Sequence, residues 1–173
     1  MKELINTKDT TEFILRDING NIIPIWKSWF GINPRIPFIT GRYVKSLKRH
    51  NTITNVGHAV ANGLMSNQGS YGFATFLAIG IGTETASTAT ALNSEITTNG
   101  GARANGTASQ TTTTQTNDTT SLTHTWTFTG SFAITEEGIL TATSGGSLLA
   151  YQTFSAINVV SGNTLQVTHT YQT

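Results

Sequence analysis

The sequence predicts a mainly β protein: an antiparallel β-sandwich of the jelly-roll kind, with one N-terminal helix and an extended N-terminal arm. Three observations lead to this fold class. Short runs of alternating apolar and polar residues fill the chain after Phe73, a single stretch has helical periodicity, and the basic residues gather in the first third. About eight strand-like runs at roughly ten-residue spacing are typical of a sandwich or jelly roll.

The composition indicates a folded chain with few charges. Its 173 residues form one domain, or one domain plus an arm. Charged residues make up 11 % of the chain, and a net charge of +1 with eight Phe argues against disorder. A weakly charged surface favours a protein packed into an assembly over a free enzyme. There is no Cys for disulfides or thiolate metal sites, and we expect neither a secretory signal nor a membrane span.

Charge divides the chain near His50. Residues 1–50 hold nine bases and four acids, a balance of +5, whereas residues 51–173 hold one base and five acids, a balance of −4. Such asymmetry is a signal of separate roles. We therefore expect a basic N-terminal arm, residues 1–50, attached to a β-sandwich body, residues 51–173.

The predicted arm begins with a β-hairpin and continues through an aromatic segment. Glu12–Ile18 and Asn21–Trp26 flank Asn19-Gly20, which is typical of a type I′ turn. The segment Trp26–Phe38 is rich in aromatics and interrupted by two prolines, which keep it out of a sheet interior. It is suited to lie across a partner's surface, and the alternative is that it packs on its own domain.

The arm also ends in a basic run, Arg42–Arg49. This run suits an acidic protein surface or the chain's own acidic body, and a nucleic acid is the less favoured partner because so short a run makes few phosphate contacts. The residues predicted to bind a partner are Trp26, Trp29, Phe30, Arg35, Phe38, Arg42, Lys45, Lys48 and Arg49.

Thr52–Met65 is the predicted helix. Thr54 or Asn55 can cap its start, and Val56, Val60 and Leu64 form one apolar stripe. Two glycines weaken it as a free helix but let it approach a sheet closely.

The body reads as strands separated by turns. The clearest runs are Phe73–Ile81, Thr107–Gln115, Leu122–Phe128, Leu148–Phe154 and Thr164–Tyr171. The Thr-rich run Ala104–Gln115 is expected at a sheet edge, and Thr135–Gly138 is expected to be a turn. One strand should present Leu122, His124, Trp126 and Phe128 on one face, and the last strand Leu165, Val167, His169 and Tyr171.

No candidate site in the body indicates catalysis or a cofactor. His124 and His169 form a two-histidine metal site only if their strands are neighbours, and structural histidines are the favoured interpretation. Glu136-Glu137 is the only adjacent pair of carboxylates and lacks the opposed placement of a glycosidase pair. Gly80-Ile81-Gly82 lacks the third glycine of a phosphate-binding loop, so a bend or close backbone approach is expected. No catalytic, cofactor-binding or metal-binding residue is predicted.

Several short segments of residues 53–173 resemble tailed-bacteriophage virion proteins, including tail-collar and fibre proteins. They are Ile53–Leu64 (ITNVGHAVANGL), Phe76–Thr83 (FLAIGIGT), Ala91–Ile96 (ALNSEI), Gly100–Arg103 (GGAR), Phe128–Gly138 (FTGSFAITEEG) and Ser144–Val160 (SGGSLLAYQTFSAINVV). These motifs are turns and core positions, so the resemblance carries no catalytic residue across. Residues 1–50 lie outside it, and Tyr151 stands where an Arg is common.

The resemblance implies a non-enzymatic virion structural protein, assembled in the host cytoplasm. Our first hypothesis is a capsid decoration or cement subunit that docks on the head through its arm. The alternatives are a tail, collar or neck component that anchors fibres, and a host-glycan-binding module using Tyr71 or Tyr151. The expected partners are the major capsid protein or other virion proteins, with a homo-oligomer such as a trimer or hexameric ring, and no membrane.

Overall fold

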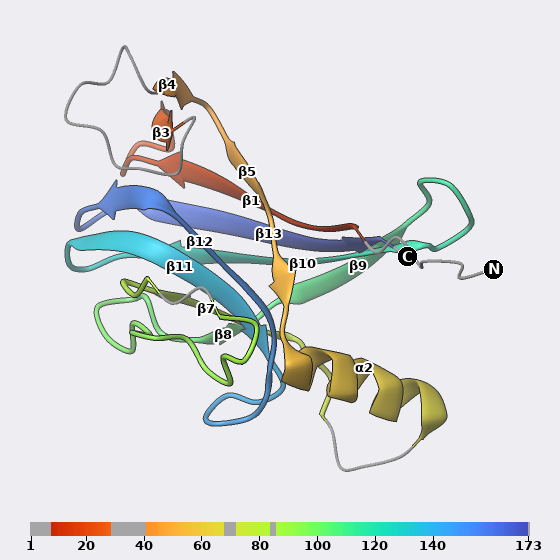
Figure 1. The fold of residues 1–173 in the computed structure, drawn as a ribbon. Coiled ribbons are helices and arrows are strands. Elements are labelled where there is room, and N and C mark those ends of the chain that lie inside the picture. The colour runs from red at the N-terminus through yellow and green to blue at the C-terminus, as the bar shows by residue number, and fades with distance from the viewer. Residues whose placement is uncertain (1–7, 29–40, 68–71, 84–85, 173) are drawn as a thin grey trace.

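The computed structural model describes residues 8–28, 41–67, 72–83 and 86–172. Figure 1 shows strands in two layers and one helix at their lower end. The strands are β1 (Lys8–Arg16), β2 (Ile22–Ile23), β3 (Ile25–Ser28), β4 (Gly41–Val44), β5 (Leu47–His50), β6 (Thr52–Ile53), β7 (Phe76–Gly80), β8 (Ala104–Asn105), β9 (Thr107–Thr111), β10 (Thr119–Thr127), β11 (Phe132–Leu140), β12 (Leu148–Val159) and β13 (Thr164–Gln172); the helix is α2 (Asn55–Ser66). The predicted mainly β, antiparallel class with one helix is confirmed.

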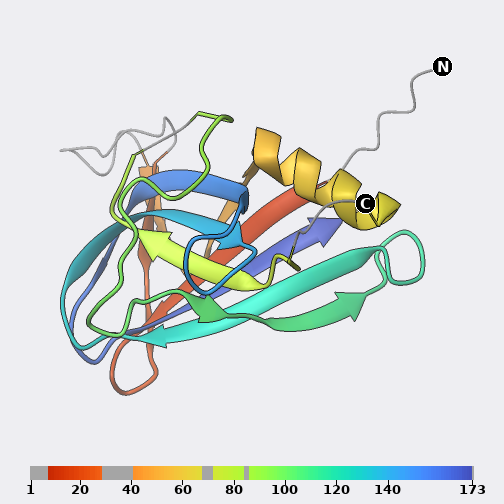
Figure 2. The ribbon, with the colours of Figure 1, turned by 90° about the horizontal axis from the view of Figure 1, so that it is seen from below.

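Two antiparallel sheets hold most of the strands. We call the one ordered β2-β1-β13-β10-β9 the first sheet, with β5 also paired to β1, and the one ordered β6-β12-β11-β7-β8 the second sheet. A separate ribbon pairs β3 with β4. Figure 2, seen from below, shows the two sheets facing each other. Apolar side chains of both form one buried cluster, including Phe13, Trp126, Val167, Ile79 and Ile157.

The predicted separation of an arm from a body is wrong for the described residues before Asn51. All nine residues of β1 pair with β13, from Lys8↔Gln172 to Arg16↔Thr164. Phe13, Leu15, Ile25 and Leu47 are buried in the common core. The charge step near His50 therefore marks no structural boundary, because strand pairing and apolar burial, rather than net charge, decide what belongs to a domain.

Two local predictions also need correction. The turn at Asn19-Gly20 joins β1 to β2, but only Gly20 has positive φ (84°), so it is not type I′. Instead, one carboxylate oxygen of Asp17 accepts hydrogen bonds from the backbone N–H groups of Asn19 and Asn21. Thr135–Gly138 is no turn either: it lies inside β11, which runs without a break past two buried glutamates.

The alternating faces of the long strands are as predicted. Leu165, Val167 and His169 are buried on one side of β13, while Leu122 and Trp126 are buried on β10. The Thr-rich strand β9 lies at the edge of the first sheet with all five residues exposed, as expected for an edge.

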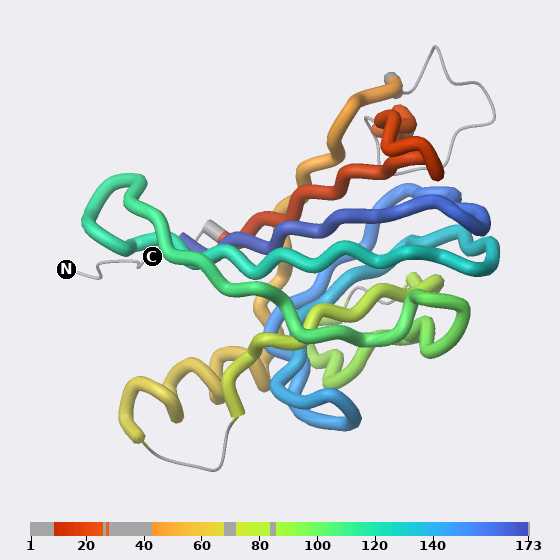
Figure 3. The backbone as a smooth tube through the Cα atoms, turned by 180° about the vertical axis from the view of Figure 1, so that it is seen from behind, coloured from red at the N-terminus to blue at the C-terminus, as the bar shows by residue number. Residues whose placement is uncertain are grey.

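Helix α2 begins three residues later than predicted, because Thr52 and Ile53 pair with β12 as β6. Thr54 is its N-cap and accepts a hydrogen bond from the Gly57 N–H. Gly57 touches the β12 backbone closely enough that a Cβ there would lie 1.9 Å from the Leu149 carbonyl oxygen. The rest of the helix extends away from the sheets (Figure 3), and only Gly57 and Val60 on it are buried. In the part of the chain that the structure describes, no helix is long and apolar enough to cross a membrane.

Candidate functional site

The most unusual feature of the interior is a histidine held between two carboxylates. His169 on β13 is fully buried; its Nε2 lies 2.7 Å from Asp9 Oδ1 and its Nδ1 lies 3.0 Å from Glu137 Oε1. Asp9 comes from β1 of the same sheet, and Glu137 comes from β11 of the opposite sheet. The imidazole therefore bridges the two sheets. We call Asp9, His169 and Glu137 the buried triad.

Neighbouring polar groups complete the buried triad. Thr11, which pairs with His169 in register, lies 3.2 Å from Glu137 Oε2 through its hydroxyl oxygen. Asn51 Nδ2 donates to Asp9 Oδ1 at 2.6 Å and to Thr11 Oγ1 at 2.9 Å. Asn51 lies between β5 and β6, where the chain passes from the first sheet to the second. The Asn51 side-chain amide therefore links Asp9 to Thr11 at the point where the chain passes between the sheets.

The buried triad keeps His169 protonated. Burial alone would lower the pKa of His169, but the charges and hydrogen bonds of Glu137 and Asp9 raise it to about 10. Both ring nitrogens then donate, one to each carboxylate. Burial, with the same two carboxylates, raises the pKa of Tyr171, whose ring lies 4.8 Å from that of His169 between centroids. The buried triad carries a formal charge of −1, because one imidazolium lies between two carboxylates in the interior.

This geometry suits a structural clamp. An Asp–His pair in nucleophilic catalysis needs its second nitrogen on a reachable hydroxyl or thiol. Here the second nitrogen meets Glu137 and the Thr11 hydroxyl, and Thr11, Glu137 and His169 all have 0 % exposure. A substrate has no access to these atoms.

His124 and His169, the pair weighed in the sequence as a less favoured metal site, do not form a shared site. His124 is a diagonal neighbour of His169 across β10 and β13, but both nitrogens of His169 are already used. No group of three or more potential ligands that could hold a metal ion occurs among the described residues. Glu136 and Glu137 point to opposite faces of β11, as neighbours in a strand do.

Glu136 serves as a backbone anchor on the outer face of the second sheet. Its carboxylate accepts hydrogen bonds from the N–H groups of Gly82 (3.0 Å), Asn93 (3.0 Å) and Ser94 (2.7 Å). A Cβ at Gly80 would lie 2.2 Å from Glu136 Oε1. The expected close backbone approach at these glycines is therefore confirmed, and a buried glutamate side chain is what approaches.

Arg103 ties down the next part of the same face. Its guanidinium binds both carboxylate oxygens of Glu95 and donates to the carbonyl oxygens of Ala142 and Gly145, each at 2.8 Å. Its side chain is only 9 % exposed. Glu136 therefore holds the segment after β7 against β11, and Arg103 holds it against the loop between β11 and β12.

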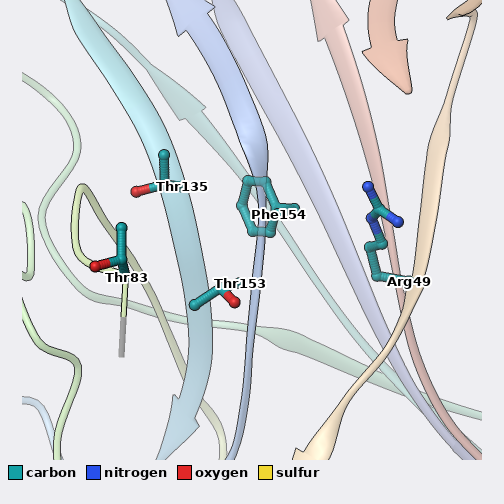
Figure 4. Close-up of a pocket in the computed structure, with 5 residues that line it drawn as sticks. All are labelled: Arg49, Thr83, Thr135, Thr153 and Phe154. Carbon is teal, nitrogen blue, oxygen red and sulfur yellow. The ribbon is translucent and has the colours of Figure 1, made fainter. Parts of the chain in front are cut away.

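A cavity opens beside Arg49, one of the residues predicted to bind a partner. It has a volume of about 290 Å³ and is lined by Arg49, Thr83, Thr135, Thr153 and Phe154. In Figure 4, Arg49 comes from β5 on one side, the threonines lie on the other, and Phe154 is drawn between them. Within the described chain, Arg49 Nε and Nη2 are buried and have no hydrogen-bond partner.

The other residues predicted to bind a partner are not brought together as a site. Lys45 and Lys48 are exposed on the β4–β5 segment, and Lys48 lies 3.8 Å from Glu12. Trp26 and Arg42 lie on β3 and β4, one position apart in register. Trp29, Phe30, Arg35 and Phe38 lie outside the described residues, as does Tyr71 of the glycan hypothesis. Tyr151 is buried against Leu92 and Leu148, so it offers no exposed stacking face.

Sequence reasoning missed the buried triad. It placed His169 correctly on an apolar face, but the residues that bind it come from positions 9, 51 and 137, which no local spacing connects. The available signal was parity: Asp9 and Thr11 are at odd positions of β1, on the same face as Phe13 and Leu15, so a carboxylate occupies the core face of a strand.

Comparison with known proteins gives no relative for this chain: no family model, no curated protein and no solved structure matches it.

Proposed function

We propose that this chain is a non-enzymatic structural subunit of a virion, with a capsid decoration or cement subunit as the first assignment. The observation that carries the proposal is that the acidic side chains of the described residues after His50 bind groups of the same chain. All four described acids after His50 have intramolecular roles: Glu137 in the buried triad, Glu136 and Glu95 as backbone and arginine anchors, and Asp118 accepting from the N–H groups of Thr113, Thr114 and Gln115.

The motifs of the resemblance support the same assignment, because they lie together. Glu136 of FTGSFAITEEG binds Gly82 of FLAIGIGT and Asn93 of ALNSEI. Arg103 of GGAR binds Glu95 of ALNSEI and Gly145 of SGGSLLAYQTFSAINVV. Segments matched separately along the sequence thus form one interlocked framework on the second sheet, and two facing sheets suit a β-sandwich of the jelly-roll kind. Scaffolding, rather than chemistry, is what these residues supply.

In this proposal the subunit docks on the head through the surface of the folded domain and not through a separate arm, since β1 and β5 belong to the first sheet. Deleting residues 1–50 would remove β1, which separates β13 from β2 and β5, and would test folding instead of docking. The direct test is to purify particles from cells that carry the gene and measure how many copies each particle contains. A copy number that matches the head lattice supports a decoration subunit. Absence from purified particles would reject the virion role.

A tail, collar or neck component is the second candidate, favoured by the tail-collar motifs on which the resemblance partly rests. It predicts a trimer or hexameric ring and a low copy number per particle. Native mass spectrometry of the purified protein, together with labelling of particles for electron microscopy, separates the two assignments by stoichiometry and by position.

A further inference from the structure

Arg49, two of whose buried nitrogens have no acceptor among the described residues, borders the cavity next to an interruption in the second sheet. In the β11–β12 ladder, Ile134 pairs with Ile157, whereas Glu136 pairs with Thr153. One residue of β11 therefore faces three residues of β12, a bulge that opens the ladder locally. Thr135, Thr153 and Phe154 at this bulge line the cavity. Bulges re-aim side chains and occur often beside functional sites.

Among the described residues, no acidic side chain pairs with Arg49. Its neighbour Lys48 has Glu12 at 3.8 Å, directly across the β1–β5 ladder. Arg49 lies opposite Thr11 instead, and within the described residues two of its buried nitrogens have no acceptor. Buried polar atoms nearly always find partners, so an unpartnered guanidinium beside a cavity indicates an acceptor supplied from outside.

The lining selects the kind of acceptor. A guanidinium offers N–H groups in a planar fork that matches a carboxylate. The lining brings one formal positive charge, three hydroxyl-bearing threonines and the Phe154 ring, so it balances a monoanion and leaves a phosphate dianion one charge short. The Thr135 hydroxyl already donates to the Gly82 carbonyl oxygen at 2.7 Å and so remains available as an acceptor only.

The surroundings indicate that the carboxylate is carried by a polypeptide segment with an apolar neighbour. β6 pairs with β12 only at Ala150 and Tyr151, and β5 and β3 lie beside β12 without pairing with it. Two further cavities border β12, one on each side of the Arg49 cavity along the strand. One, of about 150 Å³, includes His50, Thr52 and Gln152; the other, of about 200 Å³, is lined mainly by apolar side chains such as Ile25 and Ile157.

We propose that the cavity at Arg49 binds the carboxylate of an acidic side chain, carried by a segment of a partner protein that lies over the cavities between β12 and the strands β5 and β3. The Arg49 guanidinium holds the carboxylate, and the apolar cavity lined by Ile25 and Ile157 receives a neighbouring side chain of the same segment. This site is independent of the virion role, since it requires only a partner protein with an exposed segment that carries an acidic side chain.

The test follows the Arg49 Nε–H signal by NMR in the full-length protein. The probes are acetyl-Val-Glu-Val-amide, the matched peptide with Gln for Glu, acetate and inorganic phosphate. We expect a saturable shift of the signal with the Glu peptide and no saturation with the Gln peptide. Equal responses to the two peptides, or no response, would overturn the proposal. Saturation by phosphate but not by the Glu peptide would also overturn the proposal. Acetate binding as tightly as the Glu peptide would show that the site recognises no peptide segment.

Two variants separate binding from folding. Arg49→Gln should weaken the Glu peptide by about tenfold or more, as loss of a charge-assisted hydrogen bond implies, while stability stays equal or rises because a partly buried charge is removed. Lys48→Gln, at the exposed neighbouring base, should bind like the wild type. If Arg49→Gln instead unfolds the protein, or if Lys48→Gln loses the peptide equally, the guanidinium is not a ligand site.

Discussion

Replacing His169 with Leu tests whether the buried triad holds the two sheets together. The change leaves Asp9 and Glu137 facing each other in the interior without a cation. Breaking a buried ion pair by removing one partner costs about 3–5 kcal/mol. The pKa of His169 gives a comparable upper figure: one pKa unit corresponds to about 1.4 kcal/mol, so a rise from 6.5 to about 10 corresponds to at most about 5 kcal/mol.

The same triad makes stability depend on pH with a defined sign. The pKa of His169 is higher in the folded protein than in the unfolded chain. The protonated imidazole therefore stabilises the fold fully below pH 6.5, and its contribution falls as the pH rises toward about 10. The wild-type free energy of unfolding should decline across this window as the His169 ring loses its proton. In His169→Leu the two facing carboxylates share a proton, so any decline in that variant follows a carboxyl group instead.

Urea unfolding at several pH values from 6 to 10 measures both effects. His58→Gln, at an exposed position on α2, is the matched control and should stay within about 0.5 kcal/mol of the wild type. If His169→Leu does not fold, the wild-type His169 ring can be followed by NMR, where it should remain protonated through pH 8. A ring that titrates near 6.5, or a wild-type stability that does not fall between pH 6.5 and 10, would refute the reasoning.

Three further substitutions test the framework of the second sheet. Glu136→Gln should cost about 2–4 kcal/mol, because a neutral amide cannot accept all three backbone N–H groups; amide hydrogen exchange should speed up locally, and unchanged protection would contradict the anchor. Gly57→Ala should destabilise despite its better helix propensity, because its Cβ meets the Leu149 carbonyl, whereas the exposed Asn62→Ala should not, as thermal melts can compare. Arg103→Lys should lose about 1–3 kcal/mol in urea unfolding, because an ammonium cannot bind one carboxylate in a fork and two carbonyls together; wild-type stability would argue against this tie.

Much of the architecture follows from local pattern. Alternation of apolar and polar residues identified the long strands β10 and β13, and Thr54 was one of two helix caps expected before an apolar stripe. Those features depend on side-chain periodicity and on capping chemistry, which operate over a few residues.

The interior sites depend on contacts that periodicity does not encode. A run of Thr-Glu-Glu-Gly is typical of a turn, yet β11 continues through it because each glutamate finds distant donors on its own face: Glu137 at His169, and Glu136 at the loop after β7. Likewise, Arg49 was predicted to bind a partner from its place in a basic run, but the cavity beside it depends on the bulge in the β11–β12 ladder.

The sequence by itself determined the fold class, the main strands and the helix cap, since these follow from the order of apolar, polar and turn-forming residues. The tertiary structure alone decided that the first 50 positions contribute core strands, that His169 is clamped between two sheets, and that Arg49 faces a cavity. The physical reason is range: pairing β1 with β13 joins residues at opposite ends of the chain, and the charge balance of a segment carries no information about that pairing.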